Sequence, residues 1–236
     1  MRALAGIALS ATFLTAVAFI EPTVNSIDKD GLPVPLIQRP YNYANPNHPA
    51  HYLTADLKRH DNTPQNNPIT DAGATLGRVL FYDRRLSANN TKSCASCHIQ
   101  KRNFADPERR STGFEGLRTG LHAMSLTNVK YYESGHVFWT ERDRSLERQA
   151  VRPILDPVEL GMDSIPALAA KLNKTNFYPE LFRKAFGTPE ITSDRIARAI
   201  SQFERSLIST NAKFDKALAS PKPEEVFTEQ ELLGYA

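Results

Sequence analysis

Residues 93–98 read Ser-Cys-Ala-Ser-Cys-His, and this stretch governs the interpretation of the whole chain. Cys94 and Cys97 are the only cysteines, so no other thiol can pair with either of them. Their spacing, with His98 next to the second cysteine, is the Cys-x-x-Cys-His pattern of c-type haem attachment. There the two thiols add across the haem vinyl groups and the imidazole binds iron. The stretch therefore predicts one haem c, bound by Cys94 and Cys97, with His98 as an axial ligand.

Two other roles for a Cys-x-x-Cys pair fit the sequence less well. A zinc site would need two further ligands. A thioredoxin-like redox pair is expected near a βαβ pattern, and no segment shows sustained alternation of the strand kind. Haem attachment is therefore the favoured interpretation of the pair.

Composition sets broad limits on the class of protein. The chain has 236 residues, of which 41% are hydrophobic and 23% are charged, as in a soluble globular protein of one or two small domains. The 29 basic and 26 acidic side chains leave a formal net charge of only +3. A net charge this small does not create an electrostatic field that would attract nucleic acid, so no nucleic-acid partner is expected.

Residues 1–20 predict a targeting segment. Arg2 precedes a run without charge from Ala3 to Ile20, and Ala16-Val17-Ala18 supplies a small-residue cleavage site. The run is long for the apolar part of a signal peptide and short for a membrane span. A cleaved signal peptide and a retained N-terminal anchor therefore both stay open, and the periplasm is the expected compartment.

The remaining chain is expected to be mainly α: a cytochrome c-like haem domain with long loops. Residues 21–70 are rich in Pro and Asn and read as linker or wrapped coil, so the haem domain is assigned to residues 71–226. Apolar spacing predicts helices from a cap at Asp71 to Asp83, after Asp163 through Leu172, around Leu181 and Phe186, and from 193 to 208.

The last of these helices has the clearest pattern. Its apolar stripe consists of Ile196, Ile200, Phe203 and Leu207. The other face carries Arg195, Arg198, Glu204 and Arg205. The stripe is expected to face the core and the charged residues are expected to face solvent.

The residues around the haem motif resemble a known family. They are Leu76-Gly77-Arg78, Leu80-Phe81-Tyr82-Asp83, Leu86-Ser87, Phe104 and Asp106, followed by Leu126-Thr127-Asn128, Phe138-Trp139, Ser145-Leu146-Glu147, Gln149 and Pro157-Val158-Glu159. In this order and spacing they are similar to the N-terminal, peroxidatic haem domain of bacterial di-haem cytochrome c peroxidases and MauG-like enzymes. The resemblance covers residues 71–234.

This resemblance implies a function. In the family the N-terminal haem reduces hydrogen peroxide, and a second haem domain supplies electrons. The chain has no second Cys-x-x-Cys-His, and the capping box at Thr228 to Glu231 is similar to the start of that second domain. Residues 227–236 are therefore expected to be the truncated start of a second haem domain that this chain lacks.

The resemblance also implies the partners. Hydrogen peroxide is the expected substrate, a small cytochrome c or cupredoxin is the expected electron donor, and a homodimer is one expected assembly. An electron-transfer cytochrome without peroxidase activity and a MauG-like oxidase remain alternatives.

Three site residues follow from the resemblance. Glu159 matches the carboxylate that moves a proton between the peroxide oxygens, and Gln149 matches the amide beside it. Trp139, the only tryptophan, matches the residue between the two haems that relays electrons. From the residues alone, Glu159 and Gln149 would be surface polar groups and Trp139 a core aromatic, and these alternatives stay open.

Departures from the family pattern concern iron coordination. Many relatives have a second histidine ligand where this chain has Phe114, and phenylalanine cannot bind iron, so the distal position is expected to be vacant in the oxidised state. His122 matches a position near an interdomain calcium in relatives; it is a calcium-loop replacement, a distal ligand or a loop histidine. Met124 and Met162 are sixth-ligand candidates or core residues.

Overall fold

The computed structural model describes residues 26–27, 33–34 and 40–235. The predicted targeting segment, residues 1–20, and part of the Pro- and Asn-rich segment lie outside the described residues. The described α-helices and strands are β1 (Ser26–Ile27), β2 (Pro33–Val34), α1 (Ala55–Arg59), α2 (Asp71–Tyr82), α3 (Leu146–Leu155), α4 (Ile165–Asn173), α5 (Tyr178–Phe186), α6 (Ser193–Arg205), α7 (Lys213–Ala219) and α8 (Glu229–Tyr235). Short 3-10 turns are η1 (Ala50–Tyr52), η2 (Arg84–Leu86), η3 (Cys94–Ser96), η4 (Gln100–Arg102), η5 (Val129–Tyr131) and η6 (Pro223–Glu225).

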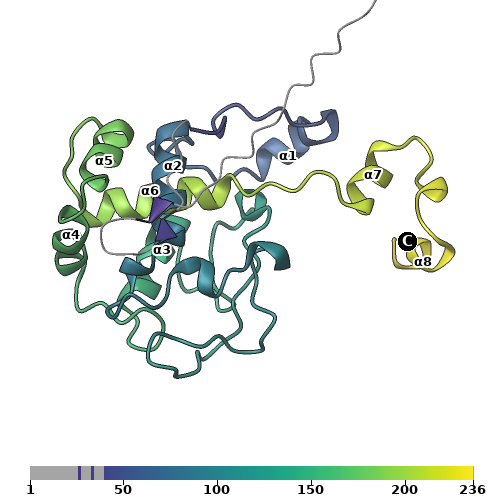
Figure 1. Cartoon of the computed structure of the whole chain (residues 1–236). Coiled ribbons are helices and arrows are strands. Elements are labelled where there is room, and N and C mark those ends of the chain that lie inside the picture. The colour runs from purple at the N-terminus through teal and green to yellow at the C-terminus, as the bar shows by residue number, and fades with distance from the viewer. Residues whose placement is uncertain (1–25, 28–32, 35–39, 236) are drawn as a thin grey trace, which may run out of the picture.

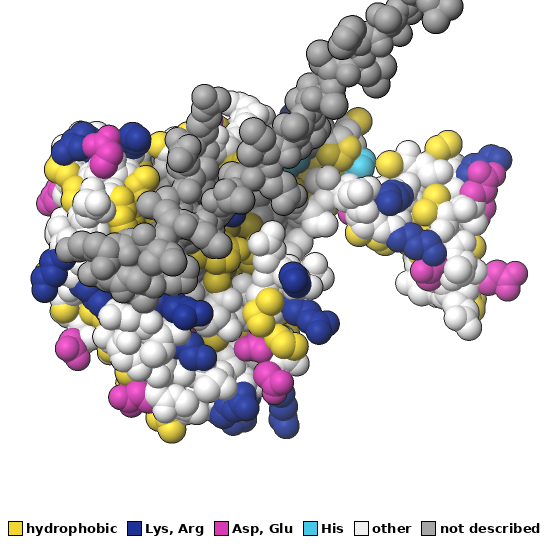
Figure 2. Space-filling model, in the orientation of Figure 1, with side chains coloured by type: hydrophobic (Ala, Val, Ile, Leu, Met, Phe, Trp, Pro, Cys, Tyr) yellow, Lys and Arg dark blue, Asp and Glu magenta, His cyan; other side chains and the backbone are white. Residues whose placement is uncertain are grey.

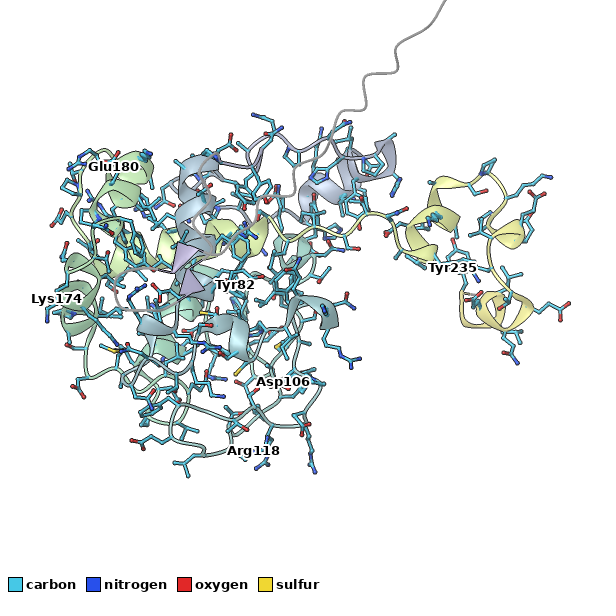
Figure 3. All side chains as sticks on the ribbon, viewed as in Figure 1. Tyr82, Asp106, Arg118, Lys174, Glu180 and Tyr235 are labelled. Carbon is cyan, nitrogen blue, oxygen red and sulfur yellow. The ribbon has the colours of Figure 1, made fainter. Side chains whose placement is uncertain are left out.

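Helices α2 to α6 form one body around the crossing of α2 and α6 (Figure 1). Helix α3 packs on α6, α5 packs on α2, and α4 lies beside α5 and η2. Long loops from 99 to 145 extend below the helices in this view, where Asp106 and Arg118 mark them in Figure 3. The only sheet among the described residues is the two-residue antiparallel pair β1 and β2. The mainly α fold class with long loops is therefore confirmed.

Side-chain oxygens fix where the helices begin. Thr70 caps α2 by accepting the Gly73 amide at 3.0 Å, so the prediction that Asp71 is the cap was wrong by one residue. Asp71 is the first helical residue, and its Oδ1 accepts the amides of Tyr43 and Ala44 at 2.8 and 2.9 Å. The same contacts hold residues 43–44 of the Pro- and Asn-rich segment against the helical body.

The hydrophobic core confirms most of the predicted stripe on α6. Ile196 and Ile200 are completely buried with Leu76 and Leu80 of α2, and Phe203 is 4% exposed. Glu204 and Arg205 were expected to face solvent and are instead 4% and 1% exposed. The reason is tertiary: α3 packs over this end of α6 and covers the side of the helix that the periodicity assigned to water.

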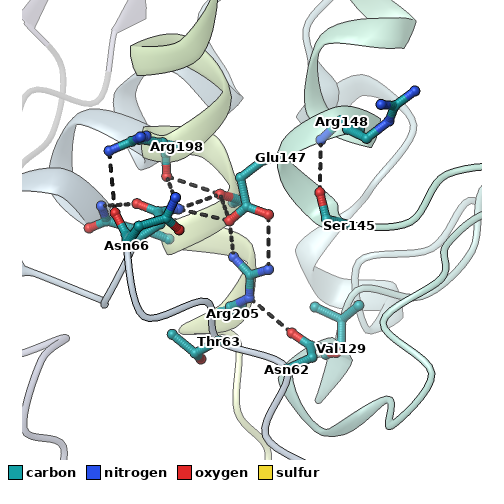
Figure 4. Close-up of polar contacts among 12 residues, drawn as sticks. Asn62, Thr63, Asn66, Val129, Ser145, Glu147, Arg148, Arg198 and Arg205 are labelled. Carbon is teal, nitrogen blue, oxygen red and sulfur yellow. Dashed lines mark hydrogen bonds and ion pairs between the residues drawn. The ribbon is translucent and has the colours of Figure 1, made fainter.

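A network of polar side chains links α6 to α3 and to the segment before α2 (Figure 4). Arg205 donates to both oxygens of Glu147 on α3, at 2.5 and 3.2 Å, and its Nε donates to Asn62 Oδ1 at 2.9 Å. Asn67 and Ser201 also donate to Glu147 Oε1, at 2.8 and 3.1 Å. This ion pair, in which Arg205 is buried and Glu147 is partly buried, and its hydrogen bonds therefore tie the segment before α2 to both α3 and α6.

Gly77 allows α2 and α6 to approach closely. A Cβ atom at this position would lie 1.8 Å from the backbone oxygen of Ala199, which cannot move out of the way as a side chain could. We expect Gly77→Ala to lower the free energy of unfolding by about 1–3 kcal/mol, the usual cost of overpacking a well-packed interface, measured by urea denaturation. Gly120→Ala is the matched control, because a Cβ there meets nothing within 4 Å. An equal loss in both variants would contradict the close-approach explanation.

The C-terminal residues form a small lobe beside the helical body, which is seen at the right of Figures 1 and 2 and carries the label Tyr235 in Figure 3. Phe214 of α7, Phe227 and Tyr235 of α8 pack together with ring centroids 5.5 to 6.2 Å apart. The predicted capping box forms: Thr228 Oγ1 accepts the Glu231 amide, and Glu231 Oε2 accepts the Thr228 amide.

None of the helices formed by the described residues is long and apolar enough to cross a membrane.

Candidate haem-binding site

The Cys-x-x-Cys-His motif folds as a tight turn directly against the core. Cys94 opens η3, and the His98 amide donates to the Cys94 carbonyl at 2.9 Å, which closes the turn. Cys94 packs against the main hydrophobic cluster, which includes Leu76, Leu80, Ile196 and Ile200, and against a smaller one of Phe81, Leu126 and Phe203. Neither cysteine is in a disulfide. The turn brings both thiols and the imidazole to one cavity, whose lining is Lys92, Ser93, Cys94, Cys97, His98, Gln149, Ala150, Pro153, Glu159, Leu160 and Glu204.

The His98 ring is held in one orientation by the loop that follows it. Its Nδ1 donates to the Phe104 carbonyl oxygen at 2.8 Å, and the backbone of Met124 also lies within hydrogen-bonding reach of the ring. The loop reaches this position through left-handed backbone at Asn103 (φ 55°) and Phe104 (φ 57°), a conformation that costs free energy in residues with a side chain. Burial lowers the pKa of His98, which favours the neutral imidazole that a metal requires.

The residues of the cavity fit a c-type haem. Two thiols that form no disulfide stand beside an imidazole whose Nδ1 is held by the Phe104 carbonyl, so Nε2 is the nitrogen that would bind iron. Gln149 Oε1 and Glu204 Oε2 are buried and have no hydrogen-bond partner within the described part of the chain. Because a buried polar atom usually has a partner, two such oxygens at the edge of one cavity are consistent with a further group in that cavity. A haem c would suit these residues: Cys94 and Cys97 would form its thioether bonds, and His98 would bind its iron.

Covalent attachment has a direct test. We expect the colour of the holoprotein to stay with the protein during extraction with acidified acetone, because carbon–sulfur bonds are not washed away. Replacing both Cys94 and Cys97 by Ala should make the haem fully extractable, whereas Cys94→Ala alone should keep one thioether, and the haem it carries should resist extraction. A wild-type protein that becomes colourless on extraction would contradict the attachment.

Glu159 lies on a folded-back turn after α3. The Asp156 Oδ1 atom accepts the amides of Val158 and Glu159 at 2.8 and 3.1 Å, and the Gly161 amide donates to the Asp156 carbonyl at 2.8 Å. The turn directs the half-buried Glu159 carboxyl into the cavity that Gln149 of α3 also lines. Burial, with Asp156 assisting and Arg142 opposing, raises the pKa of Glu159. The structure thus brings Glu159 and Gln149 together with the haem motif.

Phe114 belongs to the same side of the site as Glu159. Its amide donates to the Glu159 carbonyl at 3.1 Å, and its ring fills the space beside Gly161, where a Cβ would meet it at 2.2 Å. Gly113 fits under the turn so closely that a Cβ would lie 1.6 Å from the Val158 oxygen. The loop carrying Phe114 is therefore locked against the turn that carries the carboxylate.

Trp139 lies outside the cavity. It is 58% exposed, which excludes the core-packing alternative, and its Nε1 donates to the His122 carbonyl at 2.9 Å. His122 Nε2 donates to the Asp106 carbonyl at 2.8 Å, as expected of a histidine that organises a loop.

Met162 is 8% exposed within the main hydrophobic cluster, so it is a core residue. No cluster of three or more His, Cys, Asp or Glu side chains among the described residues could hold a metal ion, and calcium stays a prediction.

Comparison with known proteins identifies the family. The model of the di-haem cytochrome c peroxidase family matches residues 71–222. The chain belongs to the di-haem cytochrome c peroxidase family. It is 33% identical over 182 residues to the methylamine utilization protein MauG of Methylophilus methylotrophus, covering 76% of this chain and 53% of that protein. It is 36% identical over 174 residues to the cytochrome c551 peroxidase of Nitrosomonas europaea, covering 73% and 49%.

Solved structures of this family share the fold. A MauG-like protein associated with microbial copper homeostasis is 30% identical, with a TM-score of 0.64 over 84% of this chain and 53% of that one. The chain spans about half the length of the curated relatives that it matches. The resemblance found in the motifs is therefore confirmed at the level of the family.

Sequence reasoning gave no role at the site to five residues that line the cavity: Lys92, Ala150, Pro153, Leu160 and Glu204. Pro153 lies inside α3, a helix that was not predicted, and Glu204 was assigned to the solvent face of α6. No pattern in the sequence marks either residue, since burial of Glu204 depends on how α3 docks. The one sequence signal for Pro153 is its position, four residues after Gln149 and six residues before Glu159.

Proposed function

We propose that this chain is the peroxidatic haem domain of an exported cytochrome c peroxidase. It would reduce hydrogen peroxide to water with two electrons and two protons, the electrons coming from a small cytochrome c or cupredoxin. One observation carries the proposal: a single cavity is lined by the two thiols, the fixed imidazole of His98, the half-buried carboxyl of Glu159 and the amide of Gln149.

The chemistry assigns a role to each side chain. The haem, when bound, supplies the iron at which the O–O bond of peroxide breaks. Glu159 is suited to accept the proton of the peroxide oxygen nearer the iron and to return it to the farther oxygen, which leaves as water. The Gln149 amide can donate a hydrogen bond to that departing oxygen. The raised pKa of Glu159 suits a group that must both take and give a proton.

Glu159 is also reachable from the protein surface. It lines a second cavity of about 260 Å³ whose other walls are Phe138, Arg142, Arg152, Pro153, Leu155 and Asp156. Arg142, Arg152 and Leu155 are exposed, so this second cavity opens toward solvent. A carboxyl that borders both cavities can exchange protons with water on one side and act on peroxide on the other.

Other parts of the proposal come from the family and the sequence. We propose that Trp139, whose ring is exposed, passes electrons from a second haem, and that a second haem domain and an interdomain calcium complete the family architecture. We further propose that residues 1–20 direct the protein to the periplasm. A MauG-like oxidase acting on a protein or organic substrate is the second candidate, supported by the MauG relative and by Phe114 in place of a ligand histidine.

Stopped-flow absorption spectroscopy of the ferric holoprotein tests the proposal. We expect a rapid spectral change on mixing with hydrogen peroxide and a return to the starting spectrum when a reduced cytochrome c or cupredoxin is added. A lasting change that only an organic or protein substrate reverses would support the oxidase. A ferric spectrum that peroxide leaves unchanged would instead indicate an electron-carrying cytochrome.

A further inference from the structure

We propose that Glu204 is a second acid that faces the haem, held there as a neutral carboxylic acid, and that its loss of a proton lowers the reduction potential of the iron. The proposal rests on haem binding in the cavity and does not depend on peroxidase activity. It concerns a group for which the mechanism above has no use.

The position of Glu204 is unusual for a carboxyl. It lies near the end of α6, is 4% exposed, and lines the cavity together with Cys94 and His98. Its Oε2 is buried and accepts or donates no hydrogen bond within the part of the chain that the structure describes. Most buried polar atoms in proteins have a partner, and this one belongs to a side chain that lines the cavity of the two thiols and His98.

Among the described residues no lysine or arginine forms an ion pair with Glu204, although Lys92 lines the same cavity. The neighbouring Arg205 directs both terminal nitrogens to Glu147 on α3, and its Nε to Asn62. Its positive charge is therefore already paired, and the Glu147 carboxylate adds a negative charge nearby. Burying an unpaired carboxylate costs far more than burying the acid, so Glu204 stays protonated. Burial, opposed by Arg205 and assisted by Glu147, raises the pKa of Glu204 to about 8.

Other titratable groups border the same cavity and must be separated from Glu204. Cys94 and Cys97 of the attachment turn become thioethers in the holoprotein and no longer titrate. Lys92 precedes that turn, His98 is engaged by the Phe104 carbonyl and by iron, and Glu159 enters from the turn after α3. Glu159 is the one other carboxyl in the lining, and it is therefore the necessary comparison.

The charge of Glu204 acts on the iron through a medium of low dielectric constant. When Glu204 releases its proton to solvent, a negative charge is left beside the haem, and this charge stabilises the ferric state over the ferrous state. Reduction of the iron should correspondingly favour uptake of one proton by Glu204. The reduction potential should therefore fall as pH rises through the pKa of Glu204.

Spectroelectrochemical titration of the holoprotein between about pH 6 and about pH 10 tests this coupling. The wild-type potential should fall with rising pH, whereas Glu204→Gln, which keeps the shape and cannot ionise, should hold the low-pH wild-type value throughout. Glu159→Gln should retain the fall, and so should Glu180→Gln on the exposed face of α5. A fall that persists in Glu204→Gln, or one that is lost only in Glu159→Gln, would overturn the proposal.

Infrared spectroscopy of the wild-type holoprotein provides a test that needs no variant. A buried protonated carboxylic acid has a C=O stretching band separate from the amide and carboxylate bands. We expect this band to be present at neutral pH and to disappear over the pH range in which the potential falls. A flat potential, or a fall in potential with the band unchanged, would contradict the assignment even if Glu204→Gln fails to fold.

Discussion

Replacing Glu159 by Gln is expected to slow the reaction of the ferric holoprotein with hydrogen peroxide by about 100- to 10,000-fold, the range that a positioned acid–base group usually contributes. Gln keeps the size and hydrogen-bonding capacity of the side chain but cannot accept the peroxide proton. The Asp156 contacts that shape the turn involve only the backbone amides of Val158 and Glu159, so they survive the substitution. The observed rate constant in stopped-flow mixing measures the effect.

A matched control separates loss of the base from loss of structure. Glu180→Gln removes an exposed carboxylate of α5, whose partner is Arg183, and should react with peroxide at the wild-type rate. Both variants should retain covalent haem with the same ferric absorption spectrum. An unchanged rate in Glu159→Gln would show that proton transfer during O–O cleavage comes from another group, and Glu204 would then be the next carboxyl of the cavity to test.

The parts of the site that sequence predicts are the local ones. The haem motif needs only five consecutive residues, and the turn that brings Cys94, Cys97 and His98 together is closed by its own backbone. Glu159 and Gln149 are far from the motif in the chain, and chemistry alone would have left them as surface residues. Their assignment came from spacing shared with a family, and the structure brings both into the motif's cavity.

The parts that were missed depend on tertiary packing. Helix α3 buries Leu146, Ala150 and Ile154 at four-residue steps, but Pro153 inside the helix is a residue that usually argues against helix in a sequence. Because α3 was not predicted, nothing indicated that the charged end of α6 would be covered. Periodicity identifies the stripe of a helix, but it cannot say how many neighbours cover that helix, and this is why Glu204 and Arg205 were assigned to solvent.

The ion pair between Glu147 and Arg205 should contribute strongly to stability. Glu147→Gln is expected to lower the free energy of unfolding by about 3–5 kcal/mol, the usual cost of breaking a buried pair by removing one partner. The cost arises because the Arg205 guanidinium, 1% exposed, keeps its charge without a counterion. Urea denaturation measures it. Glu180→Gln breaks the exposed pair with Arg183 and should cost at most about 1 kcal/mol.

The same pair predicts how stability depends on pH. Burial acts to raise the pKa of Glu147, but hydrogen bonds and charge from Arg205, together with Asn67, lower it to about 2. A folded-state pKa below the unfolded value of 4.5 means that the contribution is complete above about pH 4.5 and is lost as the pH falls toward 2. Between those limits the wild-type free energy of unfolding should fall more steeply than that of Glu147→Gln. Parallel pH profiles for the two proteins would mean that Arg205 does not hold Glu147 ionised in the folded state.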